Sequence, residues 1–252
     1  MSFNVAAEAY DRFMGRYSRH LSAQMADLAG AGPGQRVLDV GCGPGALTTE
    51  LVARLGPESV IAVDPSESFV AAARARNPGV RVERASAEQL PFDETSFDGA
   101  LAQLVVHFMA DPAAGLAEMA RVTRPGGAVV ACVWDHAGGR GPLSQFWRAV
   151  RRLDAAADDE GQLPGTREGD LARIFAAAGL ADIDQQVLTV FVEHLTFEEW
   201  WEPFEGGVGP AGAYVASLPA PKREALRKEL RSMHPAPPFV VEARAWAARG
   251  VA

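Results

Sequence analysis

The sequence predicts an α/β fold in which a mostly parallel sheet carries helices on both faces. Between residues 31 and 133, short runs rich in β-branched residues alternate with longer stretches of helical periodicity. Helix-start signals follow some of these runs, as at Asp111, an N-cap type of residue that precedes Pro112. Strands joined by helices of this length form βαβ units, whose sheets are buried on both faces. The strands are expected at residues 35–40, 59–63, 80–83, 97–105 and 127–134.

The second half of the chain breaks this rhythm. Residues 136–169 and 196–237 contain turn-rich loops and helical stretches rather than a regular alternation. We therefore expect a single domain over residues 1–252, with a core at 35–134 and these two segments as insertions. Two further strands are expected, at residues 183–195 and 239–246.

Composition and charge narrow the classes of partner. The 252-residue chain has 48% hydrophobic and 22% charged residues, as an ordinary globular protein does. Its net charge of −8 disfavours broad contact with nucleic acid or anionic lipid, because such contact requires clustered Lys and Arg. The two cysteines, Cys42 and Cys132, fit reduced, small apolar residues better than a disulfide or a metal site. Without a signal-peptide pattern or a run of membrane-spanning length, we expect a cytoplasmic protein with no nucleic-acid or membrane partner.

A glycine-rich turn follows the first expected strand, in the stretch VLDVGCGPGALTTEL at residues 37–51. Its pattern Gly41-x-Gly43-x-x-Ala46 satisfies a loose dinucleotide-binding fingerprint, and Asp64 lies at a suitable distance downstream to bind a ribose hydroxyl. A nicotinamide-dependent oxidoreductase is therefore one hypothesis. The fingerprint is weakly specific, because many α/β turns share it.

The charge of Asp39 favours a different ligand. Glycines let the backbone approach a ligand, and a helix N-terminus favours an anion. An ionised Asp39, two residues before the first glycine, repels a pyrophosphate at that place. A ligand with ammonium and sulfonium centres reverses the sign of the interaction, and S-adenosylmethionine is such a ligand. The alternative is that Asp39 caps a neighbouring turn.

Four motifs follow one another between residues 37 and 130: VLDVGCGPG, VIAVDPSESFVAAARAR, ASAEQLPFDETSFDGALAQLVVHFMADP and ARVTRPGGAVV. Together they resemble the class I S-adenosylmethionine-dependent methyltransferases, in particular the small-molecule branch called type 11. The resemblance covers about residues 35–134 closely. It implies a Rossmann-like sheet of seven strands, mostly parallel with the last antiparallel, and helical lid insertions. It also implies that S-adenosyl-L-methionine lies across the C-terminal ends of the early strands, with S-adenosyl-L-homocysteine as the product.

The resemblance assigns cofactor contacts position by position. The glycine loop approaches the cofactor, Asp39 serves its methionine end, and Asp64 holds both ribose hydroxyls. Ser86 stands where the family usually presents an acid to the adenine, so the Ser86 hydroxyl, Glu88 or the Ala87 N–H group is left to recognise the ring. The full set expected at the cofactor is Asp39, Gly41, Cys42, Gly43, Gly45, Asp64, Pro65, Ser86, Ala87, Glu88, Gln103, Leu104 and Tyr10.

The N-terminal stretch AYDRFMGRYSRHL resembles the leading helix of the same family. Residues 1–30 are therefore expected to form a lid helix over the cofactor, with Tyr10 as the lid residue. Arg16 or Arg19 is placed to meet the methionine carboxylate. The alternative is that the helically spaced apolar residues of this stretch simply pack against the core.

Methyl transfer from a sulfonium is an in-line displacement that depends mainly on positioning, so no catalytic dyad is required. Some acceptors still need a base, and His107 and His136, which follow the fourth and fifth strands, are the candidates. The alternatives are that His107 is a wall residue and that His136 lies in an exposed loop. Aromatic residues between 191 and 214 indicate a partly apolar, small-molecule acceptor. No set of His, Cys, Asp and Glu has the spacing of metal ligands, so no metal is expected.

The leading hypothesis is therefore S-adenosylmethionine-dependent methyl transfer to an oxygen, nitrogen or carbon of a small molecule. A protein that binds S-adenosylmethionine without catalysis, in a regulatory role, is the second hypothesis. The nicotinamide-dependent oxidoreductase is the third, and Asp39 counts against it. The acceptor, the base and the oligomeric state are left open.

Overall fold

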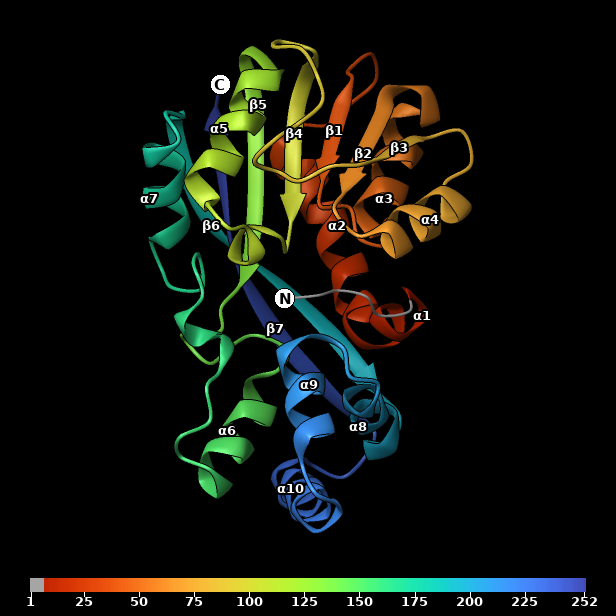
Figure 1. The fold of residues 1–252 in the computed structure, drawn as a ribbon, viewed down its shortest axis with the longest axis vertical. Coiled ribbons are helices and arrows are strands. Elements are labelled where there is room, and N and C mark those ends of the chain that lie inside the picture. The colour runs from red at the N-terminus through yellow and green to blue at the C-terminus, as the bar shows by residue number, and fades with distance from the viewer. Residues whose placement is uncertain (1–6) are drawn as a thin grey trace.

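The computed structural model describes residues 7–252, which form a seven-stranded sheet (Figure 1). The strand order is β3-β2-β1-β4-β5-β7-β6, and β7 is antiparallel to both of its neighbours. The other neighbouring strands pair in parallel. The expected mostly parallel sheet with a reversed last strand is confirmed. The strands are β1 Val37–Val40, β2 Val60–Asp64, β3 Arg81–Arg84, β4 Phe97–Gln103, β5 Thr123–Trp134, β6 Ala181–His194 and β7 Phe239–Val251.

Two strands are longer than the sequence pattern predicts. β5 begins at Thr123, opposite Phe97, rather than at residue 127, and β7 continues to Val251, opposite Ala128. The start of β5 contains Pro and Gly, which are depleted in strands and hide it in the sequence. The end of β7 has a strand on each side, and their backbone hydrogen bonds compensate for its glycine-containing sequence.

Helices cover both faces of the sheet (Figure 1). Alternate residues of a strand point to opposite faces, so Val130 of β5 joins one core and Val129 the other. Leu21 of α2 and Leu51 of α3 belong to the core of Val130, and Met119 of α5 belongs to the core of Val129. The helices are α1 Ala7–Tyr10, α2 Arg16–Ala29, α3 Ala46–Leu55, α4 Glu67–Arg76, α5 Pro112–Val122, α6 Ser144–Leu153, α7 Asp170–Ala177, α8 Phe197–Glu205, α9 Gly209–Ser217 and α10 Ala220–Met233.

Four helices of the inserted segments, α6, α8, α9 and α10, gather beyond the C-terminal ends of the parallel strands (Figure 1). We call them the helical cap. Phe146 of α6 stacks on Phe204 of α8 with ring centroids 4.6 Å apart, and meets Tyr214 of α9 edge-on at 6.3 Å. Arg152 of α6 bonds Glu229 of α10 at 2.7 Å. The two segments therefore pack together although the chain between them contains α7 and β6.

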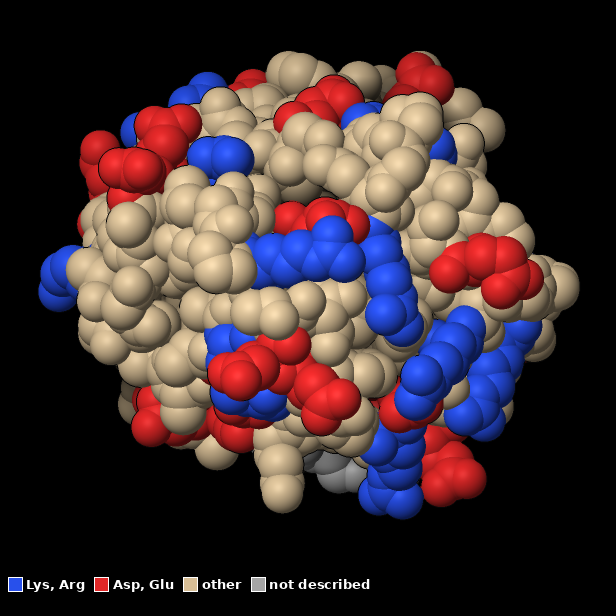
Figure 2. Space-filling model, turned by 90° about the horizontal axis from the view of Figure 1, so that it is seen from above, with Lys and Arg blue, Asp and Glu red and all other residues tan. Residues whose placement is uncertain are grey.

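The other end of the molecule, where the parallel strands begin, carries charges of both signs. Figure 2 shows this end from above, with acidic and basic side chains next to one another. Arg124 bonds Asp98 at 2.6 Å there, and the Arg36 guanidinium lies 5.2 Å from the ring centroid of Phe97. Mixed charges of this kind are typical of a solvated surface.

Candidate active site

A cavity of about 540 Å³ lies at the C-terminal edge of the parallel strands, and we call it the large cavity. β1 stands between β2 and β4 at this edge, which is a topological switch point, and open α/β sheets bind ligands at such points. The turns that follow β1, β2, β3 and β4 form much of its wall. The expected cofactor residues on this wall are Tyr10, Gly41, Gly43, Asp64, Pro65, Ser86, Ala87, Glu88, Gln103 and Leu104.

The glycine turn after β1 contains three residues in the left-handed region. The φ angle is +69° at Gly41, +53° at Gly43 and +90° at Gly45, values that favour glycine. A Cβ on Gly41 would lie 2.5 Å from the methyls of Val105, and one on Gly45 would lie 2.6 Å from the amide of Asn77. A Cβ on Gly43 would meet nothing within 4 Å. Packing therefore excludes side chains at the first and third glycines, whereas the second leaves room at the cavity for a ligand.

Asp64 ends β2 and places a carboxylate on the cavity wall, where the residue is 5% exposed. Oδ2 accepts a hydrogen bond from Gly43 N–H at 2.9 Å, and Oδ1 accepts one from Ser66 N–H at 2.8 Å. Burial raises the pKa of the Asp64 carboxyl, and these backbone hydrogen bonds oppose the rise. Each oxygen has a further lone pair, so the carboxylate has the capacity to accept both hydroxyls of a ribose.

Asp39 lies behind the cavity wall, which differs from the expected direct contact with the cofactor. Side chains of β1 alternate between the two faces, and Asp39 points toward α3, where its Oδ2 accepts a hydrogen bond from the Thr48 hydroxyl at 2.6 Å. Asp39 is 1% exposed, and its Oδ1 has no hydrogen-bond partner among residues 7–252. Burial, opposed by the Thr48 bond, raises the pKa of Asp39 to about 7. Cys42 and Gly45 are also buried and do not line the large cavity.

The segment after β3 forms the wall that is expected to face the adenine. Ser86 is exposed at the cavity, and Ala87 is buried beside it. Glu88 Oε1 accepts a hydrogen bond from Ala110 N–H at 2.8 Å, which ties it to the loop before α5. One oxygen of Glu88 is therefore engaged by the protein, while the Ser86 side chain remains at the cavity.

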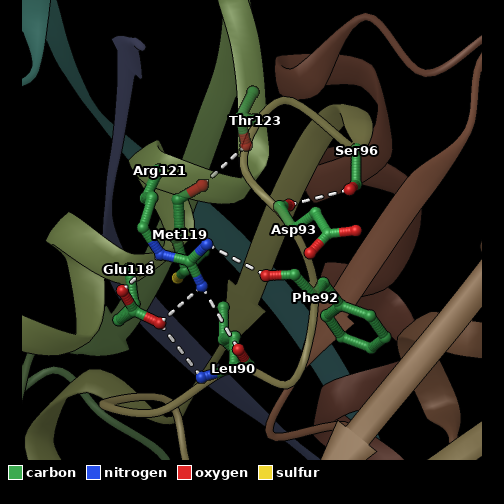
Figure 3. Close-up of polar contacts among 8 residues, drawn as sticks. All are labelled: Leu90, Phe92, Asp93, Ser96, Glu118, Met119, Arg121 and Thr123. Atoms are coloured by element: carbon green, nitrogen blue, oxygen red, sulfur yellow. Dashed lines mark hydrogen bonds and ion pairs between the residues drawn. The ribbon is translucent and has the colours of Figure 1, made fainter.

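Arg121 of α5 holds the loop that continues from this segment (Figure 3). Its Nη1 donates to Phe92 O at 2.9 Å and its Nη2 to Leu90 O at 3.2 Å. Glu118, one helical turn earlier, accepts from Arg121 at 2.8 Å and from Leu90 N–H at 3.1 Å. Arg121 of the motif ARVTRPGGAVV thus anchors the loop that follows the segment expected to face the adenine, a role that the sequence did not predict.

The N-terminal elements close the large cavity from one side. Tyr10 packs edge-on against Phe69 with ring centroids 5.4 Å apart, and burial raises the pKa of Tyr10 to about 12. Gln103 Nε2 donates to Ser18 O of α2 at 3.0 Å, and this hydrogen bond orients the side-chain amide of Gln103. Gln103 Oε1 is then buried without a partner in the part of the chain that the structure describes. An unpaired buried acceptor at the cavity is suited to an ammonium group.

Arg16 is turned away from the large cavity, in contrast to the expected contact with the methionine carboxylate. Its Nη1 lies 3.0 Å from His194 Nδ1, and its Nη2 donates to Glu199 Oε1 at 3.0 Å. Because a guanidinium only donates, His194 Nδ1 is the acceptor, and His194 Nε2–H then donates to the Tyr17 hydroxyl at 3.0 Å. Arg19 is exposed. Residues 1–6 of the expected lid lie outside the described residues.

A second cavity, of about 40 Å³, adjoins the first, and we call it the small cavity. Both are lined by Tyr10, Leu104, His107 and Phe108. The π-helical segment Asp11–Gly15, the end of β5 and the start of α9 also contribute to the small cavity. Its remaining lining residues are Phe13, Met14, Trp134, His136, Leu143, Glu160, Val208, Gly209, Pro210 and Ala211.

Both histidines expected at the acceptor line the small cavity, with ring centroids 6.1 Å apart. His107 is 5% exposed, and its Nδ1 finds no hydrogen-bond partner within residues 7–252. Burial lowers the pKa of His107 well below its usual value, and His136 adds to the shift. Burial also lowers the pKa of His136, against the opposing charges of Glu160, Asp159 and Asp135. Both imidazoles are therefore neutral near pH 7.

The structure adds cavity residues that the sequence analysis missed. Glu67 and Phe69 fall inside a quoted motif, in the first turn of α4, so a signal for them was present. Glu160 lies in a polar, turn-rich segment without periodicity, and no local pattern marks it. The missed residues of the large cavity are Ser66, Glu67, Phe69, Arg84, Val105, Phe108 and Met109.

Two negative observations apply to the described part of the chain. Residues 7–252 contain no group of three or more His, Cys, Asp or Glu side chains placed to hold a metal ion. In the same range, no helix combines the length and apolarity needed to cross a membrane. The expected absence of a metal cofactor stays a prediction.

Sequence comparison finds methyltransferases. Residues 38–131 match the type 11 family described as a methyltransferase domain. An uncharacterised methyltransferase of Mycobacterium tuberculosis is 37% identical over 135 residues, which are 54% of this chain and 52% of that protein. The demethylmenaquinone methyltransferase of Renibacterium salmoninarum is 38% identical over 110 residues, 44% of this chain and 46% of that protein. The chain therefore spans about half the length of these relatives.

The fold extends the likeness to nearly the whole chain. The crystal structure of the YcgJ protein of Bacillus subtilis matches 93% of this chain and 97% of its own, with a TM-score of 0.60 and 20% identity. At this identity the match shows the fold, which confirms the expected Rossmann-like architecture. The family match covers the glycine turn, Asp64 and the adenine-side loop described above. Over residues 38–131, the chain is therefore similar to the type 11 methyltransferase family, and the solved structures extend that likeness to the fold alone.

Proposed function

We propose that the protein is an enzyme that transfers the methyl group of S-adenosylmethionine to a small-molecule acceptor. The observation that carries the proposal is the contact between the two cavities, which share four lining residues. A cofactor in the large cavity and an acceptor in the small cavity would meet at Leu104 and His107. A protein that only binds the cofactor has no need of a second cavity at this place.

The residues of the large cavity fit the cofactor. Asp64 has acceptor capacity for two ribose hydroxyls, Gly43 leaves space at the turn, and Gln103 Oε1 is free to accept from the ammonium group. When bound, S-adenosylmethionine supplies an electrophilic methyl group on a sulfonium sulfur. Tyr10 and Phe69 cover one side of the cavity and reduce its access to water.

The small cavity suits the reacting end of a partly apolar acceptor. Phe13, Phe108 and Trp134 contribute aromatic walls, and Leu143 adds an aliphatic one. In-line displacement requires the attacking atom to be held on the methyl side of the sulfur, so orientation by such walls supplies much of the rate. The relative named for demethylmenaquinone as its acceptor supports a small-molecule acceptor here. A cytoplasmic location is part of the proposal, supported by two buried free cysteines.

Calorimetry with S-adenosylmethionine, S-adenosylhomocysteine and NAD tests the cofactor. We expect the first two to bind and NAD not to bind. The variant Asp64→Asn loses charge-assisted hydrogen bonds to the ribose, which are worth about 1.5–3 kcal/mol each, so its affinity should fall at least about 10-fold. Glu58→Gln, at an exposed acid outside both cavities, is the matched control and should bind as the wild type does.

Two results would contradict the proposal. Tight binding of NAD with no binding of S-adenosylhomocysteine would favour the oxidoreductase. Equal affinity of Asp64→Asn and wild type would remove the cofactor assignment. If the cofactor binds but no member of a panel of phenols, amines and isoprenoids is methylated, the protein is a regulatory cofactor-binding protein instead.

A further inference from the structure

The small cavity contains a buried carboxylate that the proposed function does not use. Glu160 begins the 3₁₀ turn Glu160–Gln162 and is 4% exposed. Its Oε2 accepts a hydrogen bond from Trp147 Nε1–H at 2.8 Å. The cavity residues that the structure describes include no Lys or Arg to neutralise it. A carboxylate buried in this way costs free energy, so its presence calls for a role.

His136 lies among three carboxylates that favour its protonated form: Glu160, Asp159 and Asp135. Asp135 and Asp159 each accept a hydrogen bond from a backbone N–H at 2.8 Å, and Arg151 pairs with Asp159. Glu160 is the one of the three that lines the cavity with His136. Of the three carboxylates, Glu160 is therefore the one placed to act on the same cavity as the imidazole.

The neighbouring histidine is also buried but lacks the opposing carboxylates. Burial and the charge of His136 both disfavour protonation of His107, and no acid opposes them in the part of the chain described. Of the two imidazoles at the cavity, His136 is therefore the one that can take up a proton during a reaction. His107 is left as a neutral wall residue, which was the alternative for it.

The walls discriminate among acceptor classes. An anionic acceptor would meet Glu160 with no cation among the described lining residues, so carboxylates and phosphates are disfavoured. A neutral amine attacks through its own lone pair and needs no base beforehand. A hydroxyl becomes a good nucleophile only when its proton is removed, which matches a base supported by a carboxylate.

We propose that the acceptor is an uncharged phenol, that its hydroxyl enters the small cavity, and that His136 is the general base, with Glu160 as a positioning residue behind it. This inference rests on the proposed function. A volume of about 40 Å³ holds the hydroxyl end only, so the ring rests at the boundary with the large cavity, beside Tyr10 and Phe108.

The step balances without a further reactant. The phenol O–H proton moves to the ring nitrogen of His136 that faces the cavity, and the oxygen lone pair forms a bond to the methyl carbon. The carbon–sulfur bond breaks, and its electron pair stays on sulfur. The products are the aryl methyl ether, S-adenosylhomocysteine and an imidazolium at His136, which later releases its proton to water.

NMR titration of ring-labelled histidines tests the pairing of His136 with Glu160 without any turnover. The groups that face His136 are Asp135, Asp159, Glu160, His107 and Tyr10. In Glu160→Gln, the amide oxygen still accepts from Trp147, but the charge is lost. We therefore expect the pKa of His136, identified by its absence in His136→Asn, to fall by about 1 unit.

Trp147→Phe is the matched control. It removes the hydrogen bond to Glu160 but keeps an aromatic ring and leaves the carboxylate in place. A merely structural role for Glu160, through its hydrogen bond with Trp147, would make this variant shift the pKa of His136 while Glu160→Gln leaves that pKa unchanged. We expect it to lower thermal stability while the pKa of His136 stays within about 0.3 units of wild type, because charge rather than packing sets the shift.

Binding and transfer with simple probes test the acceptor. In the protein saturated with S-adenosylhomocysteine, phenol should bind at least 10-fold more tightly than benzoate and should shift the His136 ring signals. With S-adenosylmethionine, phenol should yield anisole, and His136→Asn should lower that rate about 100-fold while leaving calorimetric binding of S-adenosylhomocysteine unchanged.

Several outcomes overturn the inference. These are tighter binding of benzoate than phenol, methylation of aniline without anisole from phenol, no anisole at saturating phenol, or an unshifted pKa of His136 in Glu160→Gln. If one of these outcomes is found, but S-adenosylhomocysteine binds the wild type and binds Asp64→Asn more weakly, the proposed function stands and only this inference fails. Failure of the wild-type protein to bind S-adenosylhomocysteine would instead refute the proposed function.

Discussion

The large and small cavities adjoin each other, yet different parts of the chain build them. Turns that follow four neighbouring strands form the large cavity, and backbone geometry sets its main features: Gly43 leaves space, and N–H groups hold Asp64. The small cavity is formed by side chains from α1, the end of β5, the Glu160 turn and α9. Local turns therefore build the large cavity, the proposed cofactor site, and long-range packing that includes the helical cap builds the small cavity, the proposed acceptor site.

Each region contains a buried carboxylate with a single hydrogen-bonded side-chain partner, and the two differ in where they face. Asp39 bonds Thr48 and lies behind the wall of the large cavity, whereas Glu160 bonds Trp147 and lines the small cavity. A sealed carboxylate affects stability through its own protonation, and a carboxylate at a cavity affects whatever enters it. The comparison predicts a stability effect at Asp39 and a chemical effect at Glu160.

The largest effect should come from filling the space beside Gly43. In Gly43→Leu the side chain enters the large cavity, because a Cβ there meets no protein atom within 4 Å. We expect affinity for S-adenosylhomocysteine to fall at least about 1,000-fold, or about 4 kcal/mol, by calorimetry. The fold should persist, with a loss of about 1–2 kcal/mol from the left-handed backbone at φ +53°.

Gly34→Leu is the matched control for this experiment. Gly34 also has a left-handed backbone, with φ +88°, and also meets nothing within 4 Å, but it is exposed between α2 and β1. It should lose similar stability and bind the cofactor normally. Equal loss of binding in both variants would mean that strain, and not occupancy of the cavity, is responsible.

A smaller effect should come from the sealed carboxylate. The pKa of Asp39 is about 7 in the folded protein, above its unfolded value near 4, so its stabilising contribution is complete below about pH 4 and is lost as pH rises to about 7. Asp39→Asn removes this dependence. From pH 5 to pH 8 the free energy of unfolding of the variant, relative to wild type, should therefore rise by about 3 kcal/mol in urea titrations.

The control for Asp39→Asn is Asp184→Asn, at an exposed position on β6. It should show no such trend with pH. A stability difference at Asp39 that is the same at both pH values would mean that its carboxyl is solvated and ionised throughout. A large loss of cofactor affinity in Asp39→Asn would restore the expected direct contact with the methionine end.

Local signals made the wall of the large cavity predictable from sequence. The glycine turn, Asp64 and the Ser86 segment lie within short motifs that follow strands, and parallel strands bring such turns to one edge. Asp111 also caps α5 as expected, accepting from Ala114 N–H at 3.1 Å. The position of Asp39 behind the cavity wall has a physical reason: proximity in sequence to the turn does not say which face of β1 its side chain occupies.

The wall of the small cavity was not predictable in the same way. His107 and His136 were found because each follows a strand, but Glu160 follows a helix and a polar loop. Only the packing of that loop against Trp147 brings its carboxylate to the cavity. No local pattern predicts that Arg121 bonds the loop at residues 90–92, because its hydrogen bonds to Leu90 O and Phe92 O join positions about 30 residues apart.

The prediction with the smallest expected effect tests whether α2 only packs against the rest of the protein or also contacts the cofactor. Arg16 joins α2 to His194 of β6 and Glu199 of α8, and its ion pair with Glu199 is partly exposed. Arg16→Met should therefore lower the free energy of unfolding by about 1 kcal/mol, as read from urea titration, and leave the affinity for S-adenosylhomocysteine within about 2-fold of wild type. Arg19→Met, at the exposed arginine on the same helix, should change neither.

The opposite pattern for Arg16→Met, a 10-fold loss of affinity with unchanged stability, would show that its guanidinium reaches the methionine carboxylate in the complex. The N-terminal helix would then contact the cofactor directly. In that case a side chain of α2, and not only the local turns after the strands, would contribute to the proposed cofactor site.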